Sequence, residues 1–171
     1  MTKISEQIDK LTSSIENAIT GERFLTDVLP VFSSEIKASD WVFNWKAETK
    51  YNSRSVFKLV THENPKVIHG LLSIEDKNDH IFMHLLESAK FNKGKNKVYE
   101  GVAGNLVAYA CKVAFEYNYD GIVSFVSKTQ LIEHYQETLG AKQFGRGSQM
   151  FIDTPQSYQL FKRYFPNEKQ S

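Results

Sequence analysis

The chain has 171 residues, of which 41% are hydrophobic and 13% aromatic, a composition that excludes long disordered tracts and fits one domain with its own core. Its 21 lysines and arginines nearly balance its 20 aspartates and glutamates, so we expect no nucleic acid and no membrane as partners. A single cysteine excludes an intramolecular disulfide. The N-terminus lacks the apolar region of a signal peptide, and no run of about 18 apolar residues marks a spanning helix, so we expect a soluble, cytoplasmic protein.

The first 21 residues have the spacing of an amphipathic helix. Apolar side chains recur three and four residues apart, at Ile4, Ile8, Leu11, Ile15 and Ile19, which predicts a helix over residues 1–21. The apolar stripe of this helix needs a surface to pack on. That surface is either the rest of the domain or a second copy of the chain, so a homodimer is one of the partners considered.

Residues 22–51 have no clear pattern and are assigned no element. Pro30 interrupts the segment, and an aromatic cluster follows at Trp41, Phe43 and Trp45. These aromatic side chains either line a substrate pocket or belong to the core, and the core is the favoured interpretation.

The next part of the chain predicts a sheet. The runs "SVFKLVT", "VIHGLLSIED" and "HIFMHLLESA" are separated by short polar connections, as in an antiparallel meander. They are followed by a predicted helix from Gly104 to about Tyr117, the strand "GIVSFVS", a helix ending at Gly140, a hairpin turning at "GRGS" and a helix beginning at Thr154. This order indicates an α+β or mixed α/β fold, with a mixed, mainly antiparallel sheet flanked by helices.

The stretch "KVYEGVAGNLV" places two glycines, Gly101 and Gly104, at the start of a helix. A helix N-terminus leaves backbone amides unpaired and has a partial positive charge, so a glycine turn before it is suited to bind an anion. The signatures of a P-loop and of a dinucleotide-binding turn are absent. Taken alone, the two glycines favour a simple helix hinge over a phosphate site.

The wider context resembles a known family. "VYEGVAGNLV" follows a strand and opens an amphipathic helix, and it is followed by "DGIVSFVS", a helix with Tyr135 that ends at "TLGA", and a hairpin. This arrangement resembles the GNAT superfamily of acyl-CoA N-acyltransferases over about residues 55–155. The resemblance implies a single GNAT-like domain over residues 1–171, with a twisted mixed sheet and an acyl-CoA-binding core at about 55–155.

The resemblance also implies acetyl-CoA, or another acyl-CoA, as cofactor. The family binds the pyrophosphate through backbone amides of a glycine turn, and Val98 here stands where the family has Gln or Arg. The pantetheine arm would lie in the gap between the strand that ends near Glu87 and "GIVSFVS". The cofactor-binding residues implied are Leu85, Leu86, Glu87, Lys95, Lys97, Gly101, Val102, Ala103, Gly104, Asn105, Leu106, Ser127 and Lys128.

Direct acyl transfer to an amine needs a base for the amine proton and an acid for the leaving thiolate. The family resemblance makes Tyr135 the candidate acid, and Glu87 and Glu75 are the candidate bases by position. Strand alternation predicts that Glu87 shares a face with Ile81, Met83 and Leu85 as a semi-buried carboxylate, which suits a base. No metal is expected, because His80 and His84 on one strand would lie about 13 Å apart.

Three functions remain open. The first is an N-acyltransferase acting on a small-molecule or protein amine, with acetyl-CoA as the acyl donor. The second is a catalytically inactive protein of the same fold that binds acyl-CoA or a partner, to which Val98 and the position of Tyr135 point. The third is an interaction domain without a cofactor that dimerises through residues 1–21.

Overall fold

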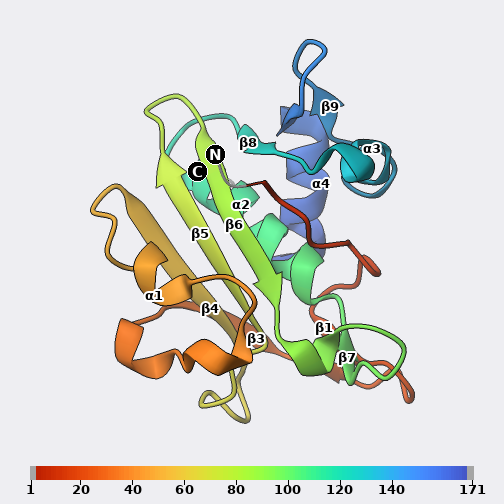
Figure 1. Cartoon of the computed structure of the whole chain (residues 1–171). Helices are drawn as coiled ribbons and strands as arrows, with labels where there is room; N and C mark the ends of the chain where they lie inside the picture. The colour runs from red at the N-terminus through yellow and green to blue at the C-terminus, as the bar shows by residue number, and fades with distance from the viewer. Residues whose placement is uncertain (1–2, 169–171) are drawn as a thin grey trace.

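The computed structural model describes residues 3–168, and its main feature is one seven-stranded sheet. In chain order the strands are β3 Thr26–Pro30, β4 Arg54–Thr61, β5 Gly70–Asp76, β6 Ile81–Ser88, β8 Val123–Val126, β9 Lys142–Gln143 and β10 Gln149–Ile152. The order across the sheet is β3-β4-β5-β6-β8-β10-β9, and only β6 and β8 run parallel (Figure 1). The predicted mixed, mainly antiparallel sheet is confirmed.

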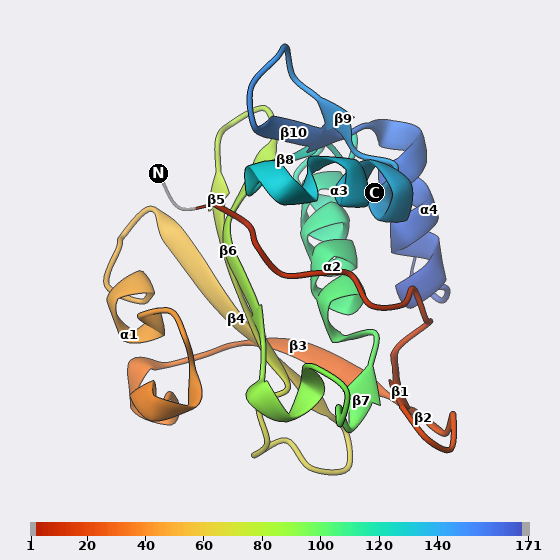
Figure 2. The same cartoon turned by 45° about the vertical axis from the view of Figure 1, so that its right-hand side comes forward.

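Helices cover both faces of the sheet, as Figure 2 shows. One face carries α2 Val102–Glu116, with α4 Thr154–Tyr164 packed against it and α3 Ile132–Leu139 nearby. The other face carries the short helices η1 Ser33–Glu35, η2 Ala38–Asp40 and α1 Trp45–Glu48. Single turns, η3 Lys90–Asn92 and η4 Thr129–Leu131, follow β6 and β8. Within residues 3–168, no helix is both long and apolar enough to cross a membrane.

The local signals that predicted the C-terminal elements act as expected. Gly140 ends α3 in a left-handed conformation with φ 65°, which glycine adopts without steric cost. The side chain of Asp153 accepts a hydrogen bond from the Thr154 amide at the start of α4. Between the two helices, β9 and β10 form the predicted hairpin, in which Met150 pairs with Gln143.

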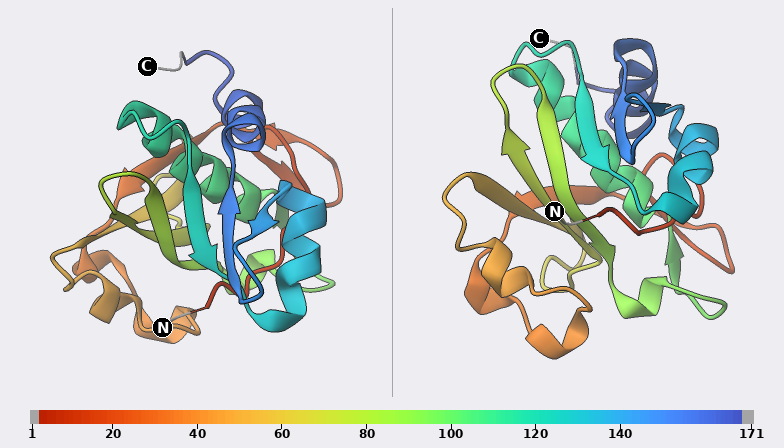
Figure 3. Two further views of the ribbon diagram at one scale, coloured as in Figure 1. Left: turned by 90° about the horizontal axis from the view of Figure 1, so that it is seen from above. Right: turned by 45° about the horizontal axis from the view of Figure 1, so that its top comes forward.

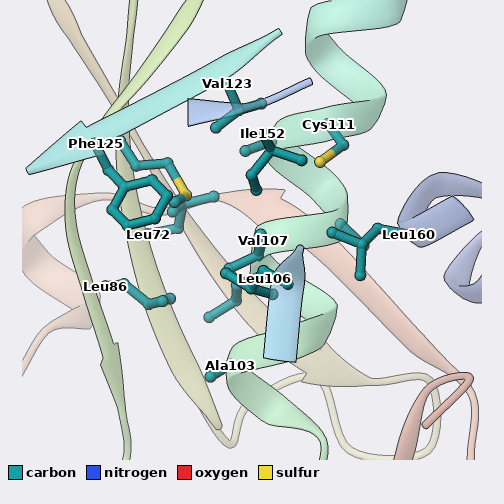
Figure 4. Packing of buried hydrophobic residues seen from close by; sticks show 14 of the residues in the cluster. Leu72, Leu86, Ala103, Leu106, Val107, Cys111, Val123, Phe125, Ile152 and Leu160 are labelled. Atoms are coloured by element: carbon teal, nitrogen blue, oxygen red, sulfur yellow. The ribbon is translucent and has the colours of Figure 1, made fainter. Parts of the chain in front are cut away.

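The core lies mainly between the sheet and α2 (Figure 4). Leu72 and Leu86 of the sheet pack there with Leu106 and Val107 of α2. Cys111 is fully buried in the same cluster, and burial raises the pKa of its thiol to about 12, so it is a packing residue rather than a nucleophile. A second cluster on the opposite face confirms the core interpretation of Trp41 and Trp45; it also contains Val31, Ile36, Val56, Leu71, Leu85 and Ala89.

The predicted helix over residues 1–21 is wrong. Residues 3–14 form no helix, and the segment continues as β1 Ile15–Asn17, which pairs with β2 Arg23–Phe24 and β7 Tyr99–Glu100. Residues 1–2 of the prediction lie outside the described part of the chain. Ile4, Ile8 and Ile15 are buried as expected, but in an extended segment that runs past β8 and α3 (Figure 3). Backbone pairing with the sheet has overridden the helical spacing.

A β-bulge in β6 overturns one detail of the predicted sheet. Ser73 of β5 pairs with Leu85, whereas Ile74 pairs with Met83, so His84 is the extra residue. His84 and Leu85 therefore face the same side of the sheet, and every later residue of β6 has the opposite orientation from simple alternation. Glu87 shares a face with Leu85, but not with Ile81 and Met83, which lie in the α2 cluster.

Candidate functional site

The sheet opens at the only parallel strand pair of the seven-stranded sheet. β6 and β8 are paired from Ile81 and Val123 to Met83 and Phe125, after which β6 continues without β8 beside it. The end of β8 pairs instead with Ile4 of the N-terminal segment: the Ile4 amide donates to the Val126 carbonyl at 2.6 Å. The Lys128 amide donates to the Ile4 carbonyl at 2.9 Å. We call the opening between β6 and β8 the cleft, and residues 4–12 the cleft segment.

Glu6 is the residue that joins the two walls of the cleft. Its Oε1 accepts a hydrogen bond from the Ser88 amide of β6 at 2.8 Å, and its backbone carbonyl accepts one from the Tyr135 hydroxyl of α3. Lys93 Nζ lies 3.7 Å from Glu6 Oε2. Burial raises the pKa of Glu6, and the charge of Lys93 opposes that shift. The end of β6 and the tyrosine predicted as an acid thus face each other across one residue of the segment.

An anionic side chain lies at the glycine turn before α2. Gly101 has φ 91°, and its amide donates to Asp9 Oδ1 at 3.3 Å. Lys97 Nζ lies 3.3 Å from the second carboxylate oxygen of Asp9. Two groups predicted to bind cofactor phosphate, the Gly101 amide and the Lys97 ammonium, therefore hold a carboxylate of the same chain.

The Gly101→Ala variant is expected to lose roughly 1–3 kcal/mol of stability, because an alanine is strained at this φ. Its Cβ would lie 2.2 Å from Thr12 Oγ1 and 2.8 Å from the Ser14 carbonyl oxygen. Urea denaturation measures the change in the free energy of unfolding. Gly147→Ala is the matched control, since nothing lies within 4 Å of its added Cβ. Equal stability of the two variants would contradict the close packing of Thr12 on Gly101.

The structure brings only some of the predicted cofactor residues to the cleft. Lys97, Gly101, Ser127 and Lys128 contact the cleft segment through the bonds above or by strand pairing, whereas Lys95 is exposed. Leu85 and Leu86 are buried in core clusters on opposite faces of the sheet. The remaining predicted residues form the buried first turns of α2, namely Val102, Ala103, Gly104, Asn105 and Leu106.

Glu87, a candidate base, is bound by other groups on all sides. Its carboxylate accepts hydrogen bonds from the backbone amides of Val42 at 2.8 Å and Phe43 at 3.2 Å, and from Trp45 Nε1 at 2.8 Å. Lys93 Nζ lies 3.6 Å away, and the residue is fully buried. This arrangement favours a structural role, in which Glu87 fixes the segment before α1 to the sheet.

Glu75, the other candidate base, lies beside a pocket on the face of the sheet away from α2. The pocket has a volume of about 1110 Å³, and its lining includes Phe82 and His84 of β6 and Ser124 of β8. His84 Nε2 is 2.7 Å from Glu75 Oε1, and Lys77 Nζ is 3.2 Å from Glu75 Oε2. His84 follows Met83 and faces the opposite side of the sheet from it, so the imidazole lies on the pocket face where β6 and β8 separate.

The environment of His84 keeps its imidazole neutral at pH 7. Burial lowers the pKa of His84, and the hydrogen bond to Glu75 opposes this only in part. The same hydrogen bond lowers the pKa of Glu75, so Glu75 is ionised. With its proton on Nε2, His84 donates to Glu75 and leaves Nδ1 free to accept a proton. The pair therefore has the composition of a base and its orienting carboxylate.

A second ion pair lies on the pocket wall. Arg54 NH1 donates to Glu48 Oε2 at 2.7 Å, and its guanidinium lies 4.0 Å from the centre of the Tyr51 ring. Glu48 Oε1 is buried and has no hydrogen-bond partner among the residues described. The pocket thus combines an aromatic surface with both signs of charge.

Comparison with known proteins identifies the fold. No protein-family model matches the sequence, and no curated protein matches it. Among solved structures, "The crystal structure of KacTA-DNA complex" matches with TM-score 0.55 and 13% identity, covering 80% of this chain and 98% of that chain. "Crystal structure of AtaTR bound with AcCoA" matches with TM-score 0.53 and 12% identity, over the same shares of both chains. The chain has a GNAT-like fold.

A third similarity is weaker and supports no conclusion about this chain. The IAA acetyltransferase from Bacillus cereus ATCC 14579 aligns with TM-score 0.48 and 14% identity, over 70% of this chain and 79% of that chain. At these identities the GNAT-like fold is what the matches establish.

The expectation that nucleic acid is excluded as a partner is wrong for a GNAT-like chain. One structure of this fold, KacTA, is a complex with DNA. The expectation rested on the balance of 21 basic and 20 acidic residues. Net charge is an average over the whole surface, so a balanced total does not exclude binding through a local patch.

His84 is the site residue that sequence reasoning missed in this GNAT-like fold. Its spacing from His80 was considered only for a metal site. Pairing of His84 with Glu75 depends on the register of β5 and β6, which places Phe82 opposite Glu75 and brings His84 diagonally next to it. One signal was present in the sequence: both residues lie on adjacent strands of a predicted antiparallel meander, which brings polar side chains of the two strands together.

Proposed function

We propose that the protein is an acyltransferase that moves an acetyl group from acetyl-CoA to an amine. The observation that carries this proposal is the position of His84. The imidazole lies where β6 and β8 separate, with the cleft on one side and, on the other, the pocket that His84 lines and beside which Glu75 lies. An acyl donor in the cleft and an amine in the pocket would meet at this point.

The residues of the cleft fit an anionic cofactor. The turn at Gly101 already accepts a carboxylate, together with Lys97, and both groups suit a pyrophosphate. The Ser88 amide and the backbone of Ser127 and Lys128 offer further hydrogen-bonding groups on the two walls. The binding of AcCoA by AtaTR, a structure of the same fold, supports this assignment.

The chain supplies the proton transfers of the reaction. Bound acetyl-CoA would supply the thioester, whose carbonyl the amine attacks. Nδ1 of His84 accepts the proton that the amine loses, and Glu75 keeps the other ring proton on Nε2. As the amine bonds to the carbonyl carbon and the C–S bond breaks, the Tyr135 hydroxyl on the opposite wall would give its proton to the leaving thiolate. Burial raises the pKa of this hydroxyl, so it is protonated at pH 7 before the reaction.

Two measurements test the proposal. Coenzyme A at millimolar concentration is expected to raise the melting temperature, because it binds the native state only. Release of thiol from acetyl-CoA is then followed over a panel of small amines and peptides, with reactions that lack the protein as the control for spontaneous hydrolysis. Acyltransferase activity is contradicted if coenzyme A stabilises the protein and yet no amine of the panel accelerates thiol release.

One observation favours a second candidate, a non-catalytic protein of the same fold. The cleft segment already occupies the hydrogen-bonding groups that a cofactor would use, namely those of Ser127, Ser88 and Gly101. A permanently filled cleft would leave both the melting temperature and thiol release unchanged. The thermal measurement therefore separates the two candidates before any acceptor is known.

A further inference from the structure

We infer that residues 4–12 are an internal competitor of acyl-CoA, and that this segment must leave the cleft before the cofactor binds. The inference rests on the proposed function, because it names what regulates access to the same cleft. It predicts two states of the protein. In the closed state, as here, the cleft segment runs from the end of β8 past Ser88 of β6 to the Gly101 turn. In the open state acyl-CoA takes its place.

Each anchor of the segment uses a group assigned to the cofactor. Ile4 pairs with the end of β8 at Ser127, and Glu6 takes the amide of Ser88 and the hydroxyl of Tyr135. A backbone amide that donates to a carboxylate of the segment is not available to a second acceptor. The segment and a cofactor in the cleft therefore exclude each other.

The chemistry of the third anchor matches the ligand that it would replace. Asp9 places a carboxylate on the Gly101 amide, with the Lys97 ammonium 3.3 Å away. An anion held by a backbone amide and a lysine is the arrangement expected for a phosphate at this turn. Glu6 repeats the pattern three residues earlier, with Ser88 and Lys93. Two acidic side chains thus stand in for anionic or polar groups of the ligand.

Two features favour release of the segment, and a third, its contact with Arg163, allows the segment to be loosened without changing the cleft. Burial raises the pKa of Glu6, so the closed position disfavours its ionised form. The segment is held from outside the cleft by Arg163, which donates to the Leu11 carbonyl at 2.6 Å and to the Thr12 carbonyl at 2.7 Å from an exposed position on α4. Its apolar residues are also spaced for a helix, so the released chain has a second conformation available.

The test measures coenzyme A binding by calorimetry in the full chain and in two double variants. Glu6→Ala/Asp9→Ala removes both carboxylates from the cleft. Glu22→Ala/Glu63→Ala removes the same charge from exposed positions. We expect the first variant to bind coenzyme A about tenfold more tightly than the unaltered chain, because the closed state is weakened. The second is expected to bind like the unaltered chain.

Hydrogen exchange gives a readout that does not depend on activity. The amides of Ile4 and Ile8 are bonded to the Val126 carbonyl and to His134 Nε2, and they are expected to lose protection when coenzyme A is saturating. If the first double variant fails to fold, Arg163→Ala replaces it, since this change loosens the segment from outside the cleft.

The outcomes separate the inference from the proposed function. Equal affinity in all proteins, with protection of Ile4 and Ile8 retained, would overturn the inference and leave the acyltransferase proposal intact. If coenzyme A binds to none of the proteins, including the variant Glu6→Ala/Asp9→Ala or its replacement Arg163→Ala, both the inference and the acyltransferase proposal are overturned. Tighter binding of coenzyme A by that variant, with loss of exchange protection at Ile4 and Ile8 on binding, would support the competitor role.

Discussion

The His84→Ala variant is expected to lower kcat by about 10²- to 10⁴-fold, the range typical for loss of a general base. Without the imidazole, no neutral nitrogen accepts the amine proton where β6 and β8 separate. Steady-state kinetics on any acceptor found in the panel measures the change. His80→Ala is the matched control, because His80 also lines the pocket but is bonded to Asp79 rather than to Glu75. Similar losses in both variants would contradict the assignment of His84.

The pH profile gives an independent check on the same residue. Because burial lowers the pKa of His84 from the ordinary histidine value of 6.5, the imidazole is neutral above pH 6.5 and kcat is expected to be flat there. As pH falls through the lowered pKa, the base becomes protonated and kcat decreases. Glu75→Gln removes a group that raises this pKa, so the acid limb should move to lower pH. Movement toward higher pH would contradict the pairing.

The Glu87→Ala variant is expected to lose about 3–5 kcal/mol of stability. Its carboxylate satisfies the amides of Val42 and Phe43 and the indole of Trp45, and it lies near Lys93. Removing the carboxylate leaves these donors and a lysine without their acceptor, and unpaired buried groups are costly. Urea denaturation of the unaltered and altered chains measures the difference in the free energy of unfolding.

Two comparisons make this second prediction specific. Glu87→Gln keeps one acceptor oxygen and is expected to lose less stability than Glu87→Ala. Glu63→Ala, at an exposed position, is expected to change stability by less than about 0.5 kcal/mol. A loss below about 1 kcal/mol for Glu87→Ala would contradict the role of Glu87 as the anchor of the segment before α1.

The sheet and its helices were predictable because their signals are local. The meander of β4, β5 and β6 follows from apolar runs and short polar connections, and Gly140 and Thr154 mark helix ends. The N-terminal segment was mispredicted because helical spacing describes only which side chains are apolar. This spacing contains no information about the open edge at the end of β8, with which the backbone of Ile4 pairs.

The candidate site was predictable only in part, because it depends on register. Tyr135 and the Gly101 turn were found from the family resemblance, and both lie on the cleft; their roles stay predictions. The bulge in β6 is one residue in length and leaves no pattern in the sequence, yet it turns Glu87 to the face of the sheet on which Trp45 lies. A contact that depends on one extra residue is not visible in apolar spacing.

The pairing of β1 with β7 has a consequence for how the cleft would respond to its ligand. Glu16 pairs with Glu100 and Asn17 with Tyr99, directly before the Gly101 turn, so the cleft segment is tied to the cleft by a short length of chain. Its effective concentration at the cleft is then constant and independent of how dilute the protein is. Opening would depend on the level of acyl-CoA and not on the concentration of the protein, whereas a separate inhibitor molecule would act according to its own concentration.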